Sequence, residues 1–303
     1  MDTNTESSAV TKPARRFRLW LYLLIVFGLS WPFLFATILI PVSGDEAYWS
    51  SFAWASAAML MVTVATFIAG RWVFRDGFRS VGWRWGGVSS WVMAFGLPML
   101  IWFLPAILDL LVGARTLAPF KWNTVTQTLT TITFAAILGF GEEFGFRGYL
   151  LPRLWWMGPR RAALVNGLIW WAWHYPLFLI PLLRSAPTMV TGQNLSAALT
   201  PLVTVLVLTS LHIFRLICLG IIFSYVWVRS GSIVVTSVFH GAWDTMRNLT
   251  FFWLVGSGWA GILPGVLDFP LPFLIELLLA VLFLWRGRWI LPAEVGACGE
   301  TGR

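Results

Sequence analysis

The strongest constraint on the fold of this chain is a succession of long apolar stretches. A helix that crosses the hydrocarbon core of a bilayer, about 30 Å thick, needs about 20 mainly apolar residues. Eight stretches reach that length, at roughly residues 18–40, 48–69, 90–113, 126–150, 160–183, 200–228, 232–254 and 269–290. The sequence therefore predicts an all-α integral membrane protein with about eight transmembrane helices packed as a cone or a bundle.

Composition supports a membrane protein and argues against a nucleic-acid partner. Hydrophobic residues make up 58% of the chain and charged residues 11%, against about 25% charged residues in ordinary soluble domains. The net charge is +8, but the basic residues lie at the ends of the apolar stretches and form no single basic face. Segment 71–86 alternates arginine with aromatic residues, and its position between two spans predicts contact with lipid headgroups. The expected partner is therefore the lipid bilayer.

The distribution of arginine and lysine predicts how the chain crosses the membrane, because cytoplasmic loops are enriched in these residues. With the N-terminus in the cytoplasm, that side receives Lys12, Arg15, Arg16, Arg18, Arg71, Arg75, Arg79, Arg84, Arg153, Arg160, Arg161, Arg229, Arg286, Arg288 and Arg303. The opposite side receives Arg115, Lys121 and Arg184. The sequence thus predicts a multi-pass protein of the cell membrane, with cytoplasmic tails at residues 1–17 and 293–303 and a membrane domain at 18–292. The first stretch lacks a small-residue cleavage site and is expected to remain as an uncleaved span.

Ionisable residues inside the predicted spans are the best guide to function. Each charged group at mid-bilayer depth costs about 2.5–3.5 kcal/mol on insertion scales, so it needs a partner, a wet cavity or a function. Five carboxylates and three histidines lie within the spans, namely Asp109, Glu142, Glu143, Asp244, Glu276, His174, His212 and His240. The two cysteines, Cys218 and Cys298, match neither a metal motif nor a disulfide framework.

The segment GEEFGFRGYL, residues 141–150, contains two adjacent glutamates and an arginine. Positions i and i+4 share a helix face, so Glu143 can pair with Arg147 while Glu142 points about 100° away. Glu143 should then stay ionised, whereas Glu142 has no cation on its own helix and is the candidate general base. Four glycines nearby indicate close helix packing or space for water and a substrate: Gly139, Gly141, Gly145 and Gly148.

Two later segments can bring imidazoles to the same depth. WWAWHYP places Trp170 and His174 on one helix face, and FHGAWD places His240 and Asp244 one turn apart on another helix. Counted from the predicted cytoplasmic ends, Glu142 and His240 lie about eight to ten residues deep, roughly 12–15 Å by helical rise. A shared buried pocket is expected for Glu142, His174, His240 and Asp244.

These residues form three motifs: EEFGFR at 142–147 has the form EExxxR, WWAWH at 170–174 is a variant of FxxxH, and HGAWD at 240–244 has the form HxxxD/N. In this order and at these separations they resemble the CAAX-protease and bacteriocin-processing family, the intramembrane glutamic endopeptidases related to the prenyl-protein protease Rce1. Each motif alone is weak, and the three together are specific over about a third of the chain. The resemblance implies an eight-helix protein whose conical or bundled catalytic core carries motifs 142–244.

The implied activity is hydrolysis of a peptide bond within the membrane, without a covalent acyl-enzyme, a metal ion or another cofactor. By the same resemblance, Glu142 helped by His174 would activate a water molecule for attack on the scissile carbonyl. Glu143 with Arg147 would brace the fourth helix, and a purely structural ion pair is the alternative for these two residues. The implied partner is a peptide or membrane-protein substrate.

The resemblance also implies that His240 and Asp244 bind the developing oxyanion or orient its donors. Asp244 stands where the eukaryotic prenyl proteases have asparagine, and a carboxylate donates a hydrogen bond only when protonated. Asp244 is therefore expected to accept a proton from His240. His240 is then expected to be the main hydrogen-bond donor to the oxyanion. Trp170 stands where the family usually has phenylalanine, so the aromatic wall is kept and the pocket changes shape.

Two other classes of function remain open on the sequence. A zinc peptidase could use Glu143, His174 and His240 as ligands, although HExxH and a nearby thiolate are absent. A non-enzymatic membrane scaffold, an immunity protein or a proton-coupled transporter could use the same polar crevice, with Glu142 as a proton relay. The sequence does not identify the substrate or the oligomeric state.

The remaining ionisable residues in the spans belong to no motif. His212 and its neighbour Arg215 are interpreted as packing residues. Asp109 lies close to the outer end of its span and is expected to face water. Glu276 is deeper and could pair with Arg247 from the preceding segment.

Overall fold

The computed structural model describes residues 12–39, 45–119, 121–190, 195–255 and 270–291. Its long helices are α1 (Lys12–Leu39), α2 (Asp45–Ile68), α3 (Val88–Leu111), α4 (Trp122–Glu143), α6 (Pro159–Val190), α7 (Leu195–Ser230), α8 (Ile233–Trp253) and α9 (Pro270–Arg286). Each long helix overlaps one predicted apolar stretch, so the all-α fold is confirmed. The first helix begins at Lys12, inside the segment predicted as a tail.

Short elements connect and extend the long helices. They are η1 (Ala69–Phe74), η2 (Arg79–Val81), β1 (Thr116–Leu117), η3 (Phe144–Leu150), α5 (Leu151–Leu154), η4 (Trp155–Met157) and β2 (Leu254–Val255). The strands form an antiparallel pair in which Thr116 faces Val255. This pair ties the connection between α3 and α4 to the end of α8.

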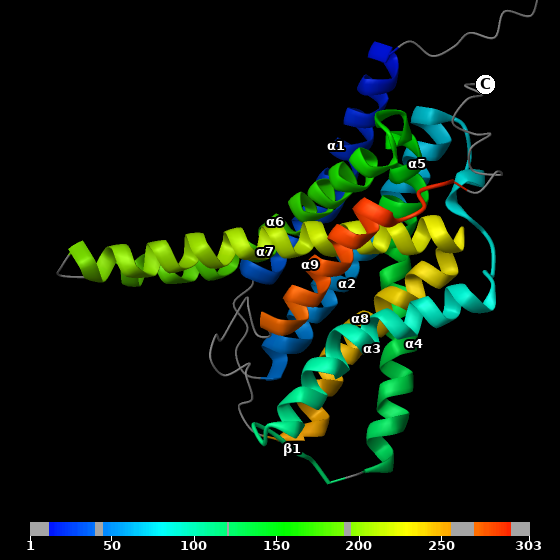
Figure 1. Ribbon diagram of the computed structural model, residues 1–303. Coiled ribbons are helices and arrows are strands. Elements are labelled where there is room, and N and C mark those ends of the chain that lie inside the picture. The colour runs from blue at the N-terminus through cyan, green and yellow to red at the C-terminus, as the bar shows by residue number, and fades with distance from the viewer. Residues whose placement is uncertain (1–11, 40–44, 120, 191–194, 256–269, 292–303) are drawn as a thin grey trace, which may run out of the picture.

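Four segments among the described residues are long and apolar enough to cross a membrane: Ala14–Thr37, Ser50–Phe74, Val88–Leu111 and Ser210–Ser230. By contrast, α4 begins with the polar run WNTVTQTLTT, and α8 carries His240, Asp244, Arg247 and Asn248. The two helices pack along each other (Figure 1). The polar run of α4 is mostly exposed, and the hydroxyls of Thr130 and Thr131 donate to backbone carbonyls one turn earlier in the same helix.

Helix pairs build the rest of the bundle. Figure 1 shows α6 and α7 side by side as a long hairpin, with α1 and α2 as a second pair. Helix α3 packs against α8, and α9 packs against α7. The core between them is rich in large aromatic side chains, and Trp102, Trp173, Trp227, Phe146 and Phe223 are each at most 1% exposed.

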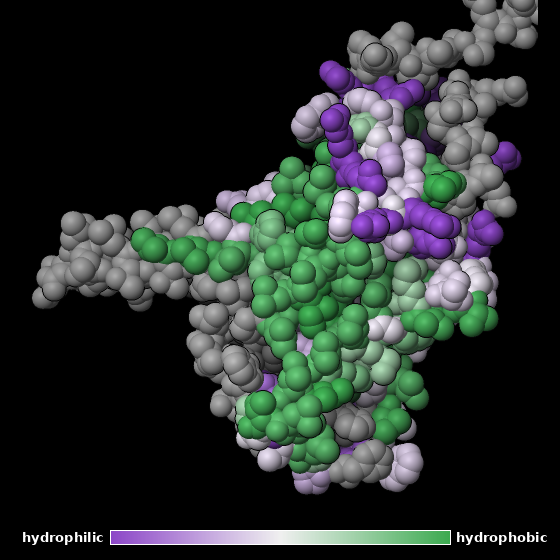
Figure 2. All heavy atoms as spheres, viewed as in Figure 1, coloured by the Kyte–Doolittle hydropathy of each residue, from purple (hydrophilic) through white to green (hydrophobic). Residues whose placement is uncertain are grey.

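The start of α1 and the end of α9 lie at the same end of the molecule (Figure 1). The guanidinium of Arg16 lies 5.9 Å from the ring centroid of Trp156, and Arg160 donates a hydrogen bond of 3.3 Å to the carbonyl of Trp285. Figure 2 shows hydrophobic residues across the middle of one face and hydrophilic residues gathered at this end. The arrangement agrees with an even number of crossings, and its orientation relative to the cytoplasm stays a prediction.

Segment 71–86 closes this end of the bundle. Trp72, Trp83 and Trp85 are exposed, as expected for side chains at a headgroup layer. Asp76 pairs with Arg153 of α5, with 2.5 Å between Oδ2 and Nη2, and the Arg153 guanidinium lies 3.3 Å from the ring centroid of Tyr149. The segment is therefore attached to the helix that follows the two adjacent glutamates.

Candidate active site

The two glutamates lie where α4 changes its helix type. Helix α4 ends at Glu143, and the chain continues without a break as the π-helix η3. The hydroxyl of Tyr22 donates to the carbonyl of Gly145 at 2.9 Å, and the Asn166 amide donates to the carbonyl of Phe146 at 2.7 Å. Side chains from α1 and α6 thus satisfy carbonyls that the widened turn exposes. Such single-turn π segments occur frequently at functional sites.

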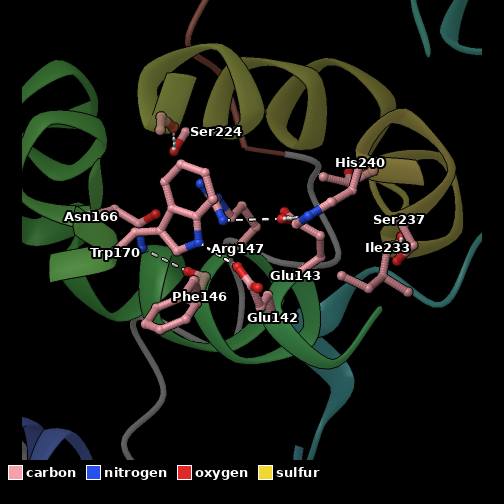
Figure 3. A network of polar contacts seen from close by, with 12 residues as sticks. Glu142, Glu143, Phe146, Arg147, Asn166, Trp170, Ser224, Ile233, Ser237 and His240 are labelled. Atoms are coloured by element: carbon pink, nitrogen blue, oxygen red, sulfur yellow. Dashed lines mark hydrogen bonds and ion pairs between the residues drawn. The ribbon is translucent and has the colours of Figure 1, made fainter. Parts of the chain in front are cut away.

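Glu143 joins three elements. Arg147 Nη1 donates to Glu143 Oε1 at 3.0 Å, and His240 Nδ1 lies 2.9 Å from the same oxygen (Figure 3). Glu143 and Arg147 are both fully buried. The ion pair between them was expected from their spacing. The contact with His240 was not, because it connects residues on α4 and α8 that are 97 positions apart.

Glu142 faces a different helix. Its Oε2 accepts a hydrogen bond of 2.6 Å from Trp170 Nε1 on α6, and the residue is 3% exposed. Figure 3 shows Glu142 directed toward Trp170, while Glu143 lies between Arg147 and His240. Adjacent carboxylates therefore have different partners, one cationic and one neutral.

His174 is held by the helix that carries it. Its Nδ1 lies 2.9 Å from the backbone carbonyl of Trp170. A carbonyl only accepts hydrogen bonds, so Nδ1 must carry the hydrogen, and Nε2 of the neutral ring is left as an acceptor. The ring packs edge-on against Trp170 and Trp173, with centroid distances of 4.8 and 4.7 Å. His174 also lies within electrostatic reach of Glu142 and His240.

Aromatic rings enclose the charged groups. The Arg147 guanidinium lies 4.4 Å from the ring centroid of Trp170 and 4.9 Å from that of Phe223. Phe223 in turn packs edge-on against His240 at 5.1 Å. Cation–π contacts of this kind are strongest where water is excluded. The rings therefore enclose the guanidinium, and Arg147 is fully buried.

Asp244 lies on the more open side of His240. Its Oδ2 is 3.6 Å from His240 Nε2, within ion-pair range but longer than a hydrogen bond. Its Oδ1 is 3.9 Å from Arg247 Nη2, and a third of the Asp244 side chain is exposed (33%). The nitrogen of His240 that is held at hydrogen-bond distance is Nδ1, by Glu143. Glu143 therefore orients this ring, a role that the sequence had suggested for Asp244.

The four glycines near the glutamates mark close contacts. A Cβ added at Gly139 would lie 2.8 Å from His240 Cγ, and one at Gly141 would lie 2.4 Å from the carbonyl oxygen of Met59. At Gly145 and Gly148 it would meet side-chain atoms of α2 and of η2. The packing interpretation of these glycines is confirmed. Neighbouring elements occupy the space beside the Cα atom at these four positions, so the glycines themselves leave no room there for water or a substrate.

An apolar cavity of about 630 Å³ lies beside the site, between α3, α4 and α8. Its walls include Trp91, Phe95, Ile132, Phe140 and Ser237. Phe140 and Ser237 each precede a site residue by one turn, Glu143 and His240 respectively. The cavity thus adjoins the helix pair that carries the site, although none of the predicted site residues lines it.

Two predictions for the other ionisable residues are wrong. Glu276 pairs with Arg215 and not with Arg247, through Nε and Nη2 contacts of 2.8 and 3.1 Å. The reason is that α9 packs against α7, which carries Arg215. Asp109 does not face water, because its side chain is 8% exposed and its Oδ2 lies 3.2 Å from Arg115 Nε.

The predicted zinc ligands do not form a cluster. His240 contacts Glu143, but His174 contacts the carbonyl of Trp170. Among the residues that the structure describes, no three His, Cys, Asp or Glu side chains come together at metal-binding distances. The geometry therefore gives the zinc interpretation no support.

Comparison with known proteins extends these observations. Residues 123–246 match a family model described as type II CAAX prenyl endopeptidase Rce1-like. The match begins in α4, ends in α8 and includes all the predicted site residues. A search of curated proteins finds no match. The family match supports a CAAX-type intramembrane endopeptidase in a multi-pass membrane protein.

Proposed function

We propose that this protein hydrolyses peptide bonds within the membrane by glutamate-activated water, because residues 123–246 match the Rce1-like family model of type II CAAX prenyl endopeptidases. The observation that carries the proposal is the unequal environment of the two glutamates. Glu143 contacts a guanidinium and an imidazole, whereas Glu142 accepts its hydrogen bond from the neutral indole of Trp170. Among the described residues no cation donates a hydrogen bond to Glu142, and the proposed role of this carboxylate is to accept a proton from water.

In the proposed reaction, Glu142 removes a proton from a water molecule that His174 Nε2 helps to align. The resulting hydroxide attacks the scissile carbonyl and forms a tetrahedral intermediate. Glu142 then returns the proton to the leaving amine, so no covalent acyl-enzyme forms. General acid–base catalysis by one positioned group typically contributes about 10²–10⁴-fold to the rate.

His240 is the proposed oxyanion donor. Its Nδ1 hydrogen is directed to Glu143, so Nε2 can donate a hydrogen bond only when the ring is an imidazolium. Glu143 and Asp244 lie on either side of the ring and attract this cation. Removing a single oxyanion donor costs about 10²–10³-fold in kcat in enzymes that stabilise such intermediates.

The apolar cavity beside the site suits a substrate with an apolar segment. Its volume of about 630 Å³ lies within the 300–1,000 Å³ that is usual for ligand pockets. A peptide held there by a lipid group or an apolar helix would pass close to α4 and α8. We propose that the substrate is a peptide or a membrane protein anchored in this way.

The function is tested by comparing membrane-protein fragments in cells that carry the wild type or the Glu142→Gln variant at equal abundance. We expect fragments with new termini only with the wild type, and their sequences identify the substrate. A purified assay with a farnesylated peptide that ends in a CAAX sequence tests the family's named substrate directly. Identical fragments in both cell lines would instead favour the non-enzymatic scaffold, immunity or transport role.

Metal removal separates the proposed mechanism from a zinc peptidase. We expect cleavage to be unchanged after exhaustive chelation of the purified protein, because Glu142 and His174 require no metal ion. The measurement is the cleavage rate before chelation, after chelation and after addition of Zn²⁺. Loss of activity that Zn²⁺ restores would contradict the mechanism.

A substitution at Gly139 tests the placement of His240. In Gly139→Ala the new Cβ displaces the imidazole ring, since it would otherwise lie 2.8 Å from Cγ. Misplacement of a reacting group by about 1 Å can cost about 100-fold, so we expect kcat to fall 10- to 100-fold. Gly96→Ala on α3 is the matched control, because no atom lies within 4 Å of its new Cβ. Equal activity of both variants would show that His240 does not act where it lies.

A further inference from the structure

Trp170 contacts three residues of the candidate active site. Its indole nitrogen donates to Glu142, and its ring lies against the guanidinium of Arg147 and the ring of His174. Phe223 packs on it as well, with centroids 5.6 Å apart. The side chain is 4% exposed, so the indole is fixed in position and orientation.

The hydrogen bond to Glu142 has a particular chemical character. An indole nitrogen only donates and does not ionise in the range where proteins fold. A buried carboxylate needs a hydrogen-bond partner, and a cationic donor would also lower its capacity to accept a proton. Trp170 supplies a partner without a charge. No hydrogen bond to Glu142 Oε1 occurs within the described part of the chain, so this oxygen is available to the reacting water.

The same residue also packs on the cation that pairs with the other glutamate. The ring of Trp170 lies 4.4 Å from Arg147 Cζ, and the guanidinium donates to Glu143. In addition, the backbone carbonyl of Trp170 holds His174 Nδ1 at 2.9 Å, which leaves Nε2 as the acceptor. One residue therefore touches each group proposed to handle the water.

We propose that Trp170 is a positioning residue for the base: its indole N–H fixes Glu142 Oε2, so that Oε1 faces the water aligned by His174. This inference rests on the proposed function. It assigns to the indole nitrogen a role that phenylalanine at this position could not perform, since phenylalanine has no donor. The effect of the ring volume and the effect of the hydrogen bond can therefore be measured separately.

Three replacements separate them. Trp170→Phe removes the N–H and part of the ring, and 3-benzothienylalanine at position 170 keeps a bicyclic ring of the same shape without the N–H. Trp171→Phe is the matched control, because the buried Trp171 Nε1 has no hydrogen-bond partner among the described residues. We expect both changes at position 170 to lower kcat about 10- to 100-fold, as for one hydrogen bond to a charged group. The KM value should stay within about twofold, and Trp171→Phe should leave both constants unchanged.

A second readout does not depend on cleavage. In protein labelled with ¹⁵N-tryptophan, the indole resonance that Trp170→Phe removes is that of Trp170. We expect this resonance to shift when Glu142 is replaced by leucine and to stay in place in Glu276→Gln. Full activity of the benzothienyl protein, or an unchanged resonance in Glu142→Leu, would overturn the inference. Failure of the proposed function looks different, because no form of the protein would then cleave a substrate while the resonance would still shift.

Discussion

Glutamine in place of Glu142 is expected to lower kcat by about 10²–10⁴-fold, the usual contribution of a general base. The amide keeps the size of the carboxylate, and its oxygen can still accept the hydrogen bond from Trp170, but it cannot take a proton from water. We expect His174→Ala to have an effect of similar size, because the water then loses its second acceptor. The measurement is single-turnover cleavage of a substrate identified from the cellular fragments.

The control for this prediction is the folded state of each variant. Both proteins should insert into the membrane, purify in the same yield and unfold at the temperature of the wild type, since neither change breaks a buried ion pair. Wild-type activity in either variant would remove the proposed mechanism. If one of the two variants fails to fold, the kinetic comparison is made with the other variant.

Removal of Glu143 is expected to damage the fold more than the removal of Glu142. In Glu143→Ala the guanidinium of Arg147 stays buried between aromatic rings without a carboxylate, and His240 loses its partner at Nδ1. Breaking one partner of a buried ion pair costs about 3–5 kcal/mol. We expect lower folded yield and an unfolding temperature in detergent that is reduced by about 10 °C.

A double variant distinguishes the destabilisation caused by an unpaired buried charge from a loss of catalytic activity. Replacing Glu143 by leucine and Arg147 by methionine removes both charges, which is often neutral or stabilising for a buried pair. We expect this protein to regain most of the yield and unfolding temperature but to remain impaired in kcat, because Glu143 no longer orients His240. A Glu143→Ala protein that is stable but inactive would show that Glu143 belongs to the chemistry itself.

The local part of the site could be predicted from the sequence. Glu143 and Arg147 are four positions apart, and their side chains meet as expected. The different direction of the Glu142 side chain also follows from helical geometry. The helix is of the π type from Phe144, which the sequence did not reveal. The pair survives this change because residues four apart remain neighbours in the wider helix.

Contacts between helices were predicted less well. Glu276 was expected to meet Arg247 of the preceding segment, and it meets Arg215 instead. Asp109 was expected in water and lies beside Arg115. In each case the partner depends on which helices pack together and on how each helix is rotated about its axis. The pattern of apolar residues along the sequence carries little information on the helix pairing or on the helix rotation.

The sequence by itself determined the eight long helices and the separation of Glu142 from Glu143, because hydrophobicity and helical period act along the chain. Only the tertiary structure decided that His240 meets Glu143 and that Trp170 meets Glu142. Those contacts require α4 to lie close against α8, where Gly139 leaves room for the imidazole, and α6 to lie beside η3. Close packing of side chains selects among many possible helix arrangements, and it exists only in the folded protein.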